Sequence, residues 1–267
     1  MKRLFPVVLA LAAAAALAFF LLPLVGLFTR TSPTEVVHRL GTSQARDALL
    51  VSLKTNAIAE ALILALGTPA AYLLATRRFP GRALVLTVLE LPLVLPPAVG
   101  GIALLAAFGR FGLLHGAGGI AFTQTAVVLA VCFVAGPFYV RPAVATFEAV
   151  DPGLIEAART LGAGPGRVFA RIALPLAAGG LGTAAAVAFA RGLGEFGATI
   201  MFAGSLQGVT QTLPLAIYAA FATDLDTAVA LGVLLVAVSA ALLLTVKLVP
   251  SWTRYALTSP YRSATSA

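Results

Sequence analysis

Residues 156–175, EAARTLGAGPGRVFARIALP, decide the fold, because this short and partly polar stretch lies between long apolar runs. The Asp-Pro pair at 151–152 is a good helix start, since Asp caps free N–H groups and Pro is tolerated at the first helical position. Apolar side chains then share one helical face at Leu154, Ile155, Ala158 and Leu161. Gly162 and Gly164 can end this helix, and Pro165 can begin another. The sequence therefore predicts a helix of about ten residues, roughly 15 Å long, lying across a membrane surface.

The same stretch has a fixed residue spacing. Glu-Ala-Ala stands at 156–158, a glycine follows after three residues, and Ile-x-Leu-Pro follows after nine more. This pattern resembles, at every signature position, the signature loop in the membrane permeases of bacterial binding-protein-dependent ABC importers. The resemblance implies a cytoplasmic loop that docks into a groove on a separate ATPase subunit, with the coupling residues Glu156, Ala157, Ala158, Gly162, Ile172, Leu174 and Pro175. From the physics of the stretch alone, an ordinary interfacial helix is an equally good interpretation.

The composition of the chain is that of a membrane protein. Of its 267 residues, 60% are hydrophobic and only 10% are charged, which excludes an ordinary soluble domain. The net charge of +8 does not indicate nucleic-acid binding, because the basic residues lie in the gaps between apolar runs. Cys132 is the only cysteine, which excludes an intrachain disulfide and a thiolate metal cluster. We expect this chain to hold no metal and no cofactor.

The apolar runs predict about six transmembrane helices. The first run, residues 4–28, is too long for a signal-peptide core and lacks a clear cleavage site, so we expect an uncleaved helix. A polar segment at 29–49 follows and predicts a short surface helix. The other runs are 51–76, 83–108, 122–141, 176–203 and 228–249. The fold class is thus an all-α integral membrane protein, and the resemblance implies the type I ABC importer permease fold with a cytoplasmic coupling helix.

Basic residues are unequally distributed between the gaps. They gather at the N-terminus, in RRFPGR at 77–82, around the signature loop and near the C-terminus. The last gap on the opposite side, 204–227, has none. Because positive residues stay in the cytoplasm, both termini and the signature loop are expected there. We divide the chain into a first helix with an outer loop, a permease core and a cytoplasmic tail, at 1–50, 51–249 and 250–267.

The third predicted span contains Pro92, Pro96 and Pro97, which break its hydrogen-bond ladder. Backbone groups freed in this way cannot face lipid, so the segment must face protein or a water-filled path. A packed kink is one interpretation. The other is a lining element of a transport pathway, where free N–H groups meet an anion. Glu90, just before these prolines, either lies in the inner half of its span or pairs with an arginine of 77–82, and we assign it no role.

The fifth predicted span carries Arg191 and Glu195, which are four residues apart and share a helix face. Charges at membrane depth pair with one another or face a cavity. They form either a structural ion pair or a place where Arg191 gives a passing anion a weak contact. Gln211 belongs to the outer segment 207–218, for which gate lining, contact with a binding protein and a simple capping loop all stay open. We assign no role to Glu60.

No catalytic motif occurs in the sequence. GxSxG, HExxH, CxxC and a nucleotide-binding P-loop are all missing, so the chain is not expected to be an enzyme, and an importer built on it must take its ATPase from another chain. The segments LPLVLPPAVGGIALL, GRFG and LGEFGATIMFAG…TQTLPLAIY resemble molybdate transporter permeases; they lie at 91–105, 109–112 and 193–218. Tungstate permeases are near, and sulfate and thiosulfate permeases share the GEFG region in a looser form.

The resemblance implies an importer that carries molybdate, and tungstate next, across the bacterial cytoplasmic (inner) membrane. Its implied partners are a second copy of this chain, two ATPase subunits that use ATP, and a periplasmic or lipid-anchored oxyanion-binding protein. Membrane lipid surrounds it, and nucleic acid is not a partner. A sulfate or thiosulfate importer is the alternative substrate assignment. A secondary transporter is the alternative class, although it would have no need of the signature loop.

Overall fold

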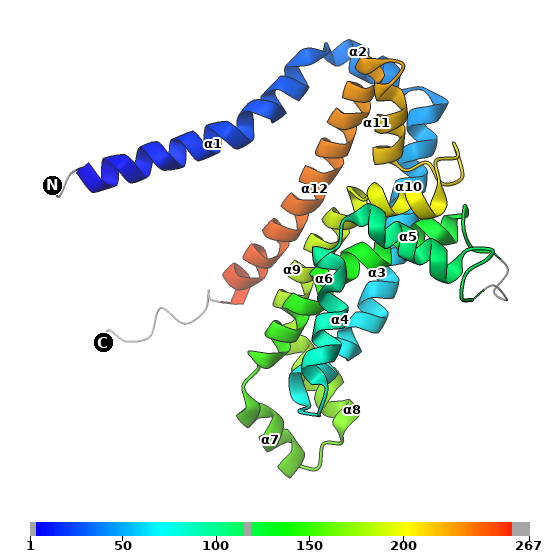
Figure 1. Ribbon diagram of the computed structural model, residues 1–267. Coiled ribbons are helices and arrows are strands. Elements are labelled where there is room, and N and C mark those ends of the chain that lie inside the picture. Colours follow the sequence, from blue (N-terminus) through cyan, green and yellow to red (C-terminus); the bar gives the residue numbers. More distant parts are fainter. Residues whose placement is uncertain (1–3, 115–118, 258–267) are drawn as a thin grey trace.

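The computed structural model describes residues 4–114 and 119–257, and its regular structure within those ranges is helical throughout. Figure 1 shows the helices in chain order. They are α1 Leu4–Arg30, α2 Pro33–Leu40, α3 Ser43–Thr76, α4 Arg82–Val94, α5 Pro97–Phe108, α6 Gln124–Glu148, α7 Pro152–Thr160, α8 Pro165–Val168, a π-helical turn Phe169–Ala173, α9 Leu174–Leu193, α10 Gly197–Ala203, α11 Leu213–Phe221 and α12 Leu225–Leu257.

Five helical segments of the described chain are long and apolar enough to cross a membrane. They are α1, α3, α6, the continuous helix Pro165–Leu193 and α12. The pair α4 and α5 is a sixth candidate, bent by 117° at its break. This arrangement confirms the predicted class, an all-helical membrane protein with about six spans. It also confirms the short surface helix between the first two spans, which is α2.

The centre of the bundle is formed by α3, α6 and α9, which pack closely because small side chains line their contacts. The buried alanines there are Ala59, Ala71, Ala135, Ala143, Ala184 and Ala188. A Cβ built at Gly180 of α9 would lie 2.5 Å from the Thr146 side chain of α6. Small residues therefore set the spacing of these helices.

A second cluster lies where α5 and α10 cross each other against α6. Leu104, Val127 and Phe202 are buried in it. A Cβ at Gly101 would lie 2.6 Å from the Ala198 carbonyl oxygen, so this crossing requires a glycine. In Figure 1 these two helices lie across the upright core helices.

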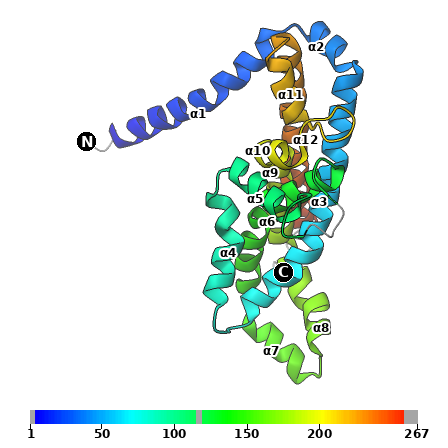
Figure 2. The same cartoon turned by 45° about the vertical axis from the view of Figure 1, so that its right-hand side comes forward.

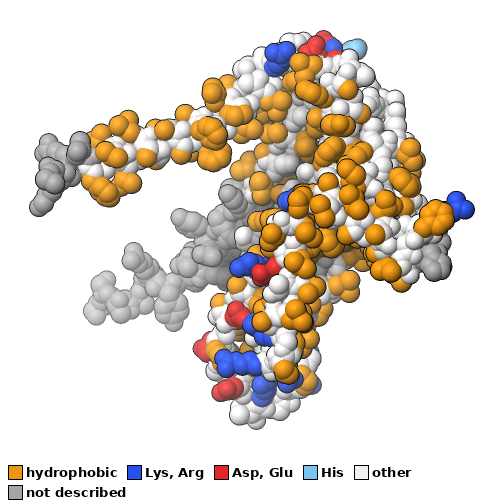
Figure 3. Space-filling model, in the orientation of Figure 1, with side chains coloured by type: hydrophobic (Ala, Val, Ile, Leu, Met, Phe, Trp, Pro, Cys, Tyr) orange, Lys and Arg blue, Asp and Glu red, His pale blue; other side chains and the backbone are white. Residues whose placement is uncertain are grey.

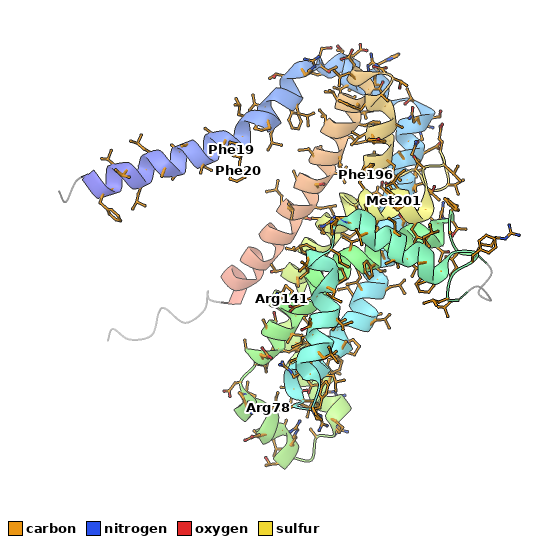
Figure 4. All side chains as sticks on the ribbon, viewed as in Figure 1. Phe19, Phe20, Arg78, Arg141, Phe196 and Met201 are labelled. Atoms are coloured by element: carbon orange, nitrogen blue, oxygen red, sulfur yellow. The ribbon has the colours of Figure 1, made fainter. Side chains whose placement is uncertain are left out.

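The helix α1 leaves the rest of the molecule, as the views in Figure 1 and Figure 2 both show. None of its best 18-residue apolar window is buried within the chain. Phe19 and Phe20 project from it with exposed fractions of 73% and 69%, and Figure 4 shows them well away from the core. An apolar surface of this kind must be covered by lipid or by another protein.

An ion-pair cluster fixes the connection from α1 to the body. Arg39 of α2 contacts Asp224 and lies 2.9 Å from Glu35, and its guanidinium donates to the Thr227 hydroxyl over 2.7 Å. The pKa of Asp224 lies below its ordinary value, first because the Thr227 hydroxyl and backbone N–H donate to the carboxylate, and also because Arg39 lies against it. The N-terminal end of α12 is therefore tied to α2.

The structure differs from the sequence expectation in the extent of several spans. The predicted fifth span, 176–203, is not one helix, because α9 ends at Leu193 and α10 begins at Gly197. The fourth span runs beyond its predicted end at residue 141 and continues to Glu148. The predicted end rested on the polar residues that begin at Arg141, but the helix continues through them.

Candidate functional site

The signature loop begins with a capped helix, as predicted. The backbone N–H of Gly153 donates to Asp151 Oδ1 over 2.8 Å, and Pro152 occupies the first helical position of α7. The helix ends at Thr160, and Gly162 follows with φ +82°, a left-handed conformation that side chains rarely adopt. The N–H of Ala163 donates to the Ala158 carbonyl over 3.0 Å, which closes the helix end.

The signature residues divide into an exposed set and a packed set. Glu156, Ala157 and Gly162 are exposed, whereas Ala158 is buried against the rest of the chain. Leu161 has an exposed fraction of 88%, which leaves an apolar side chain uncovered at the tip of the loop. Figure 1 shows α7 and α8 at one extremity of the molecule, below the core helices. The exposed set is thus available to another protein.

The second half of the signature leads into the core instead. Ile172 lies in the π-helical turn, and Leu174 and Pro175 begin α9. The preceding Phe169 packs against Tyr72 of α3 with ring centroids 4.8 Å apart, and Tyr72 packs against Phe147 of α6 at 5.3 Å. This aromatic group joins the loop to α3 and α6.

The three prolines of the third span lie around its bend. Pro92 is inside α4, Pro96 is the N-cap residue of α5 and Pro97 its first residue. The bend is covered on one side by α10, since a Cβ at Gly197 would lie 2.9 Å from Pro97 Cβ. Pro96 and Pro97 are nevertheless exposed. The structure therefore shows both a packed kink and an open face at the same place.

Arg191 and Glu195 form an ion pair with Nη1 and Oε2 2.9 Å apart. The Glu195 side chain is 1% exposed, and its other oxygen accepts the backbone N–H of Ala198 over 2.8 Å. This carboxylate therefore connects the end of α9 to the start of α10. The Arg191 side chain is 28% exposed, and its guanidinium lies 5.8 Å from the centre of the Phe138 ring. Part of the cation thus remains accessible at the middle of α6.

A layer of buried polar side chains lies above this pair, between α3 and α11. Ser52 accepts the N–H of Leu213 over 2.7 Å, and Asn56 donates to the Phe189 carbonyl over 3.0 Å. Gln211 is 7% exposed and donates to the Ser205 hydroxyl over 3.2 Å. Gln211 is therefore buried within the 204–212 loop and does not lie at an open surface.

Two further ion pairs were missed by the sequence reasoning. Glu90 pairs with Arg141 of α6 at 3.3 Å, not with an arginine of 77–82. Arg82 instead contacts Glu148 at 2.6 Å. The expected partner was wrong because α4 runs back along α6, which moves Glu90 away from the loop that precedes its helix.

Comparison with known proteins identifies the family of this chain. Residues 63–254 match the family described as binding-protein-dependent transport system inner membrane component. The chain belongs to this family. It is a multi-pass membrane permease of an ABC transporter, a transport component in which the signature loop and the bent spans have the geometry described above.

Several relatives cover most of this permease. The molybdenum transport system permease protein ModB of Mycobacterium tuberculosis is 47% identical over 248 residues, which is 88% of this chain and 90% of the relative. ModB of Escherichia coli K12 is 46% identical over 178 residues, 64% of this chain and 78% of the relative. A chain of a solved bacterial alginate ABC transporter superimposes with a TM-score of 0.74 at 17% identity, covering 91% and 92% of the two chains. That likeness shows the shared fold, a type I importer permease.

Proposed function

We propose that this permease carries molybdate through the membrane as one subunit of an ATP-driven importer. The observation that carries the proposal is the 47% identity over 88% of the chain to a permease named for molybdenum transport. The geometry agrees with such a substrate. A tetrahedral dianion must bind and also leave, which suits partly neutralised arginines and free N–H groups better than a ring of unpaired cations. Tungstate has the same charge and shape and is the expected competitor.

The partners form the second part of the proposal. Two ATPase subunits use ATP, and a periplasmic or lipid-anchored binding protein delivers the oxyanion. A second copy of this chain completes the membrane part, which is consistent with an α1 whose apolar window has no cover within its own chain. We place the assembly in the bacterial cytoplasmic (inner) membrane with both termini inside, since the basic residues are concentrated around the signature loop and the ends.

Growth of a molybdate-import mutant tests the substrate. This chain, expressed with its own ATPase and binding protein, is expected to restore molybdoenzyme activity at trace molybdate, with tungstate competing and sulfate competing poorly. If the same genes instead rescue a sulfate-uptake mutant on low sulfate and leave molybdoenzyme activity absent, the molybdate assignment is wrong and the sulfate assignment replaces it.

The coupling role of the signature loop has its own test. Gly162→Val puts a β-branched residue at φ +82°, whereas Gly164→Val puts the same side chain at φ −67° two residues away. Among the described residues, nothing lies within 4 Å of a Cβ at either position. We expect only Gly162→Val to abolish uptake and weaken co-purification of the ATPase, with normal permease levels in the membrane. Equal uptake in both variants would remove the basis for a specific docking conformation.

The orientation is tested by single cysteines in a Cys132→Ala background. A cysteine at Thr34 is expected to react with an impermeant thiol reagent in intact cells, and one at Gly164 is expected to react only after lysis. Labelling at 164 and not at 34 in intact cells contradicts the proposed topology.

A further inference from the structure

Three arginine–carboxylate pairs lie along one side of α6. Arg191 pairs with Glu195 at 2.9 Å, Arg141 with Glu90 at 3.3 Å, and Arg82 with Glu148 at 2.6 Å. Figure 3 shows basic and acidic side chains next to each other down the lower half of the molecule. Arg191 lies over the ring of an α6 residue, and the other two pairs each include a residue of α6.

The spacing on α6 places the pairs at successive depths. Phe138, against which Arg191 lies, precedes Arg141 by three residues and Glu148 by ten, and these positions share one side of the helix. At the helical rise this series extends over about 15 Å, from the middle of α6 to the end beside the signature loop. The cations therefore form a ladder that runs toward the side where α7 lies.

The Arg191 pair and the Arg141 pair differ in exposure, and the more exposed pair is the one that can exchange its partner. Glu195 is 1% exposed and is also held by the Ala198 N–H, so it stays in place. The Arg141 side chain is 65% exposed and Glu90 is 33% exposed. Glu90 lies on α4 two residues before Pro92 and close to the 117° bend, where a change in helix angle moves it relative to α6. Figure 4 shows Arg141 beside α4 at the edge of the bundle.

An arginine this exposed within a candidate span does not face hydrocarbon. Its guanidinium carries five N–H donors in a fixed fork, and the Glu90 contact uses one nitrogen. The remaining donors suit the oxygens of a tetrahedral anion. A carboxylate that stays nearby weakens the binding of that anion and provides a replacement partner when the anion leaves.

We propose that Arg141 is an anion-binding position on the inward route of the oxyanion, after Arg191, and that Glu90 is the carboxylate which the oxyanion displaces. The return of Glu90 to Arg141 then releases the oxyanion toward the cytoplasm. This inference rests on the proposed function, since it takes the anion to be the transported one. It goes further by naming the residue that holds the anion and the residue that drives its release.

The test uses the whole transporter in proteoliposomes, with radiolabelled molybdate as the probe. We expect Arg141→Gln to lower kcat for uptake about tenfold or more, the loss expected from removing a charge-assisted hydrogen bond to the moving anion. KM is expected to change little, because the binding protein captures the anion. Arg141→Lys restores part of the rate. Arg110→Gln is the control, since Arg110 is an exposed arginine that stacks on its neighbour Phe111.

Glu90→Gln separates the proposal from a purely structural pair. We expect it to lower kcat, because release of the anion becomes slower. We also expect more molybdate to stay bound to this transporter than to the wild type, because the competing carboxylate is gone. Arg141→Gln retains less. The double variant Glu90→Gln, Arg141→Gln has a neutral amide pair, and a structural role predicts that it regains the wild-type rate. We expect it to remain as slow as Arg141→Gln. A wild-type rate in Glu90→Gln or in the double variant overturns the proposal.

Failure of the substrate assignment is distinguishable from failure of this inference. If the wild-type transporter carries sulfate and not molybdate, the proposed function is wrong, and the same variants are measured with sulfate. If the wild type carries molybdate and Arg141→Gln carries it equally well, the assignment stands and the anion-binding position is wrong. Equal size-exclusion profiles and equal co-purification of the ATPase confirm that each variant is folded and assembled.

Discussion

Two spans of this permease are broken, and they are broken for different reasons. The third span bends by 117° between α4 and α5, where Pro96 and Pro97 interrupt the helical hydrogen bonds. The fifth span is interrupted between α9 and α10 without a proline. There the Glu195 carboxylate accepts the N–H of Ala198 and starts a new helix while it pairs with Arg191. The first break contains two prolines, whereas the second contains none and has instead a buried carboxylate with a charged partner.

The two breaks support each other, because the short helices that follow them cross. A Cβ at Gly101 of α5 would lie 2.6 Å from the Ala198 carbonyl oxygen, and one at Gly197 of α10 would lie 2.9 Å from Pro97 Cβ. Neither broken span could become one straight helix without separating α5 from α10. The comparison therefore predicts which substitutions disrupt both breaks and which disrupt one.

The largest effect is expected at Glu195. Glu195→Leu leaves Arg191 unpaired and removes the cap of α10, so we expect the free energy of unfolding to fall by about 3–5 kcal/mol. Thermal denaturation of the purified permease and its level in the membrane measure this. Glu195→Gln is the matched control, because its amide oxygen can still accept the Ala198 N–H, and its loss should be smaller. A Glu195→Leu permease as stable as the wild type would contradict the stabilising role of this carboxylate.

Replacing both charges separates stability from transport at the same place. In Arg191→Leu, Glu195→Leu no charge is left unpaired, so we expect stability to return to within about 1 kcal/mol of the wild type, the remainder being the lost helix cap. Uptake is expected to stay low, because Arg191 precedes Arg141 on the anion route that we propose. Recovery of both stability and uptake would make the pair structural only.

The crossing of α5 and α10 should respond next. Gly101→Ala adds a methyl group where Ala198 and Met201 leave no room, and we expect a loss of about 1–3 kcal/mol in the free energy of unfolding. Gly179→Ala is the control, since among the described residues nothing lies within 4 Å of a Cβ there. It should leave stability unchanged or raise it by up to about 1 kcal/mol. Equal denaturation midpoints for the two variants would contradict the close crossing.

The same contrast explains what could be predicted from the sequence. Pro96, Pro97 and the Asp-Pro pair at 151–152 act through their own covalent geometry or through N–H groups a few residues away, so the bend and the start of α7 were predictable. The break at Glu195 depends on an N–H that exists only once α10 has formed. The Arg141–Glu90 pair joins two helices through the tertiary fold, and a local pattern carries no information on that contact.

The smallest effect is expected from the prolines themselves. If the contacts of α5 with α10 hold the bend, Pro96→Ala, Pro97→Ala should keep it and lower the free energy of unfolding by only about 0.5–1 kcal/mol, mainly because the unfolded chain gains conformational freedom. Spin labels at Val88 and Ile102, both exposed, report the bend in a Cys132→Ala background when labelled chains are diluted with unlabelled ones. In a straight helix these positions would be about 21 Å apart along the axis, and the bend shortens that separation. If the separation between the labels is unchanged, packing holds the bend. If it shifts toward the straight-helix value, the prolines cause the bend, and the crossing of α5 and α10 is only a consequence of the bend.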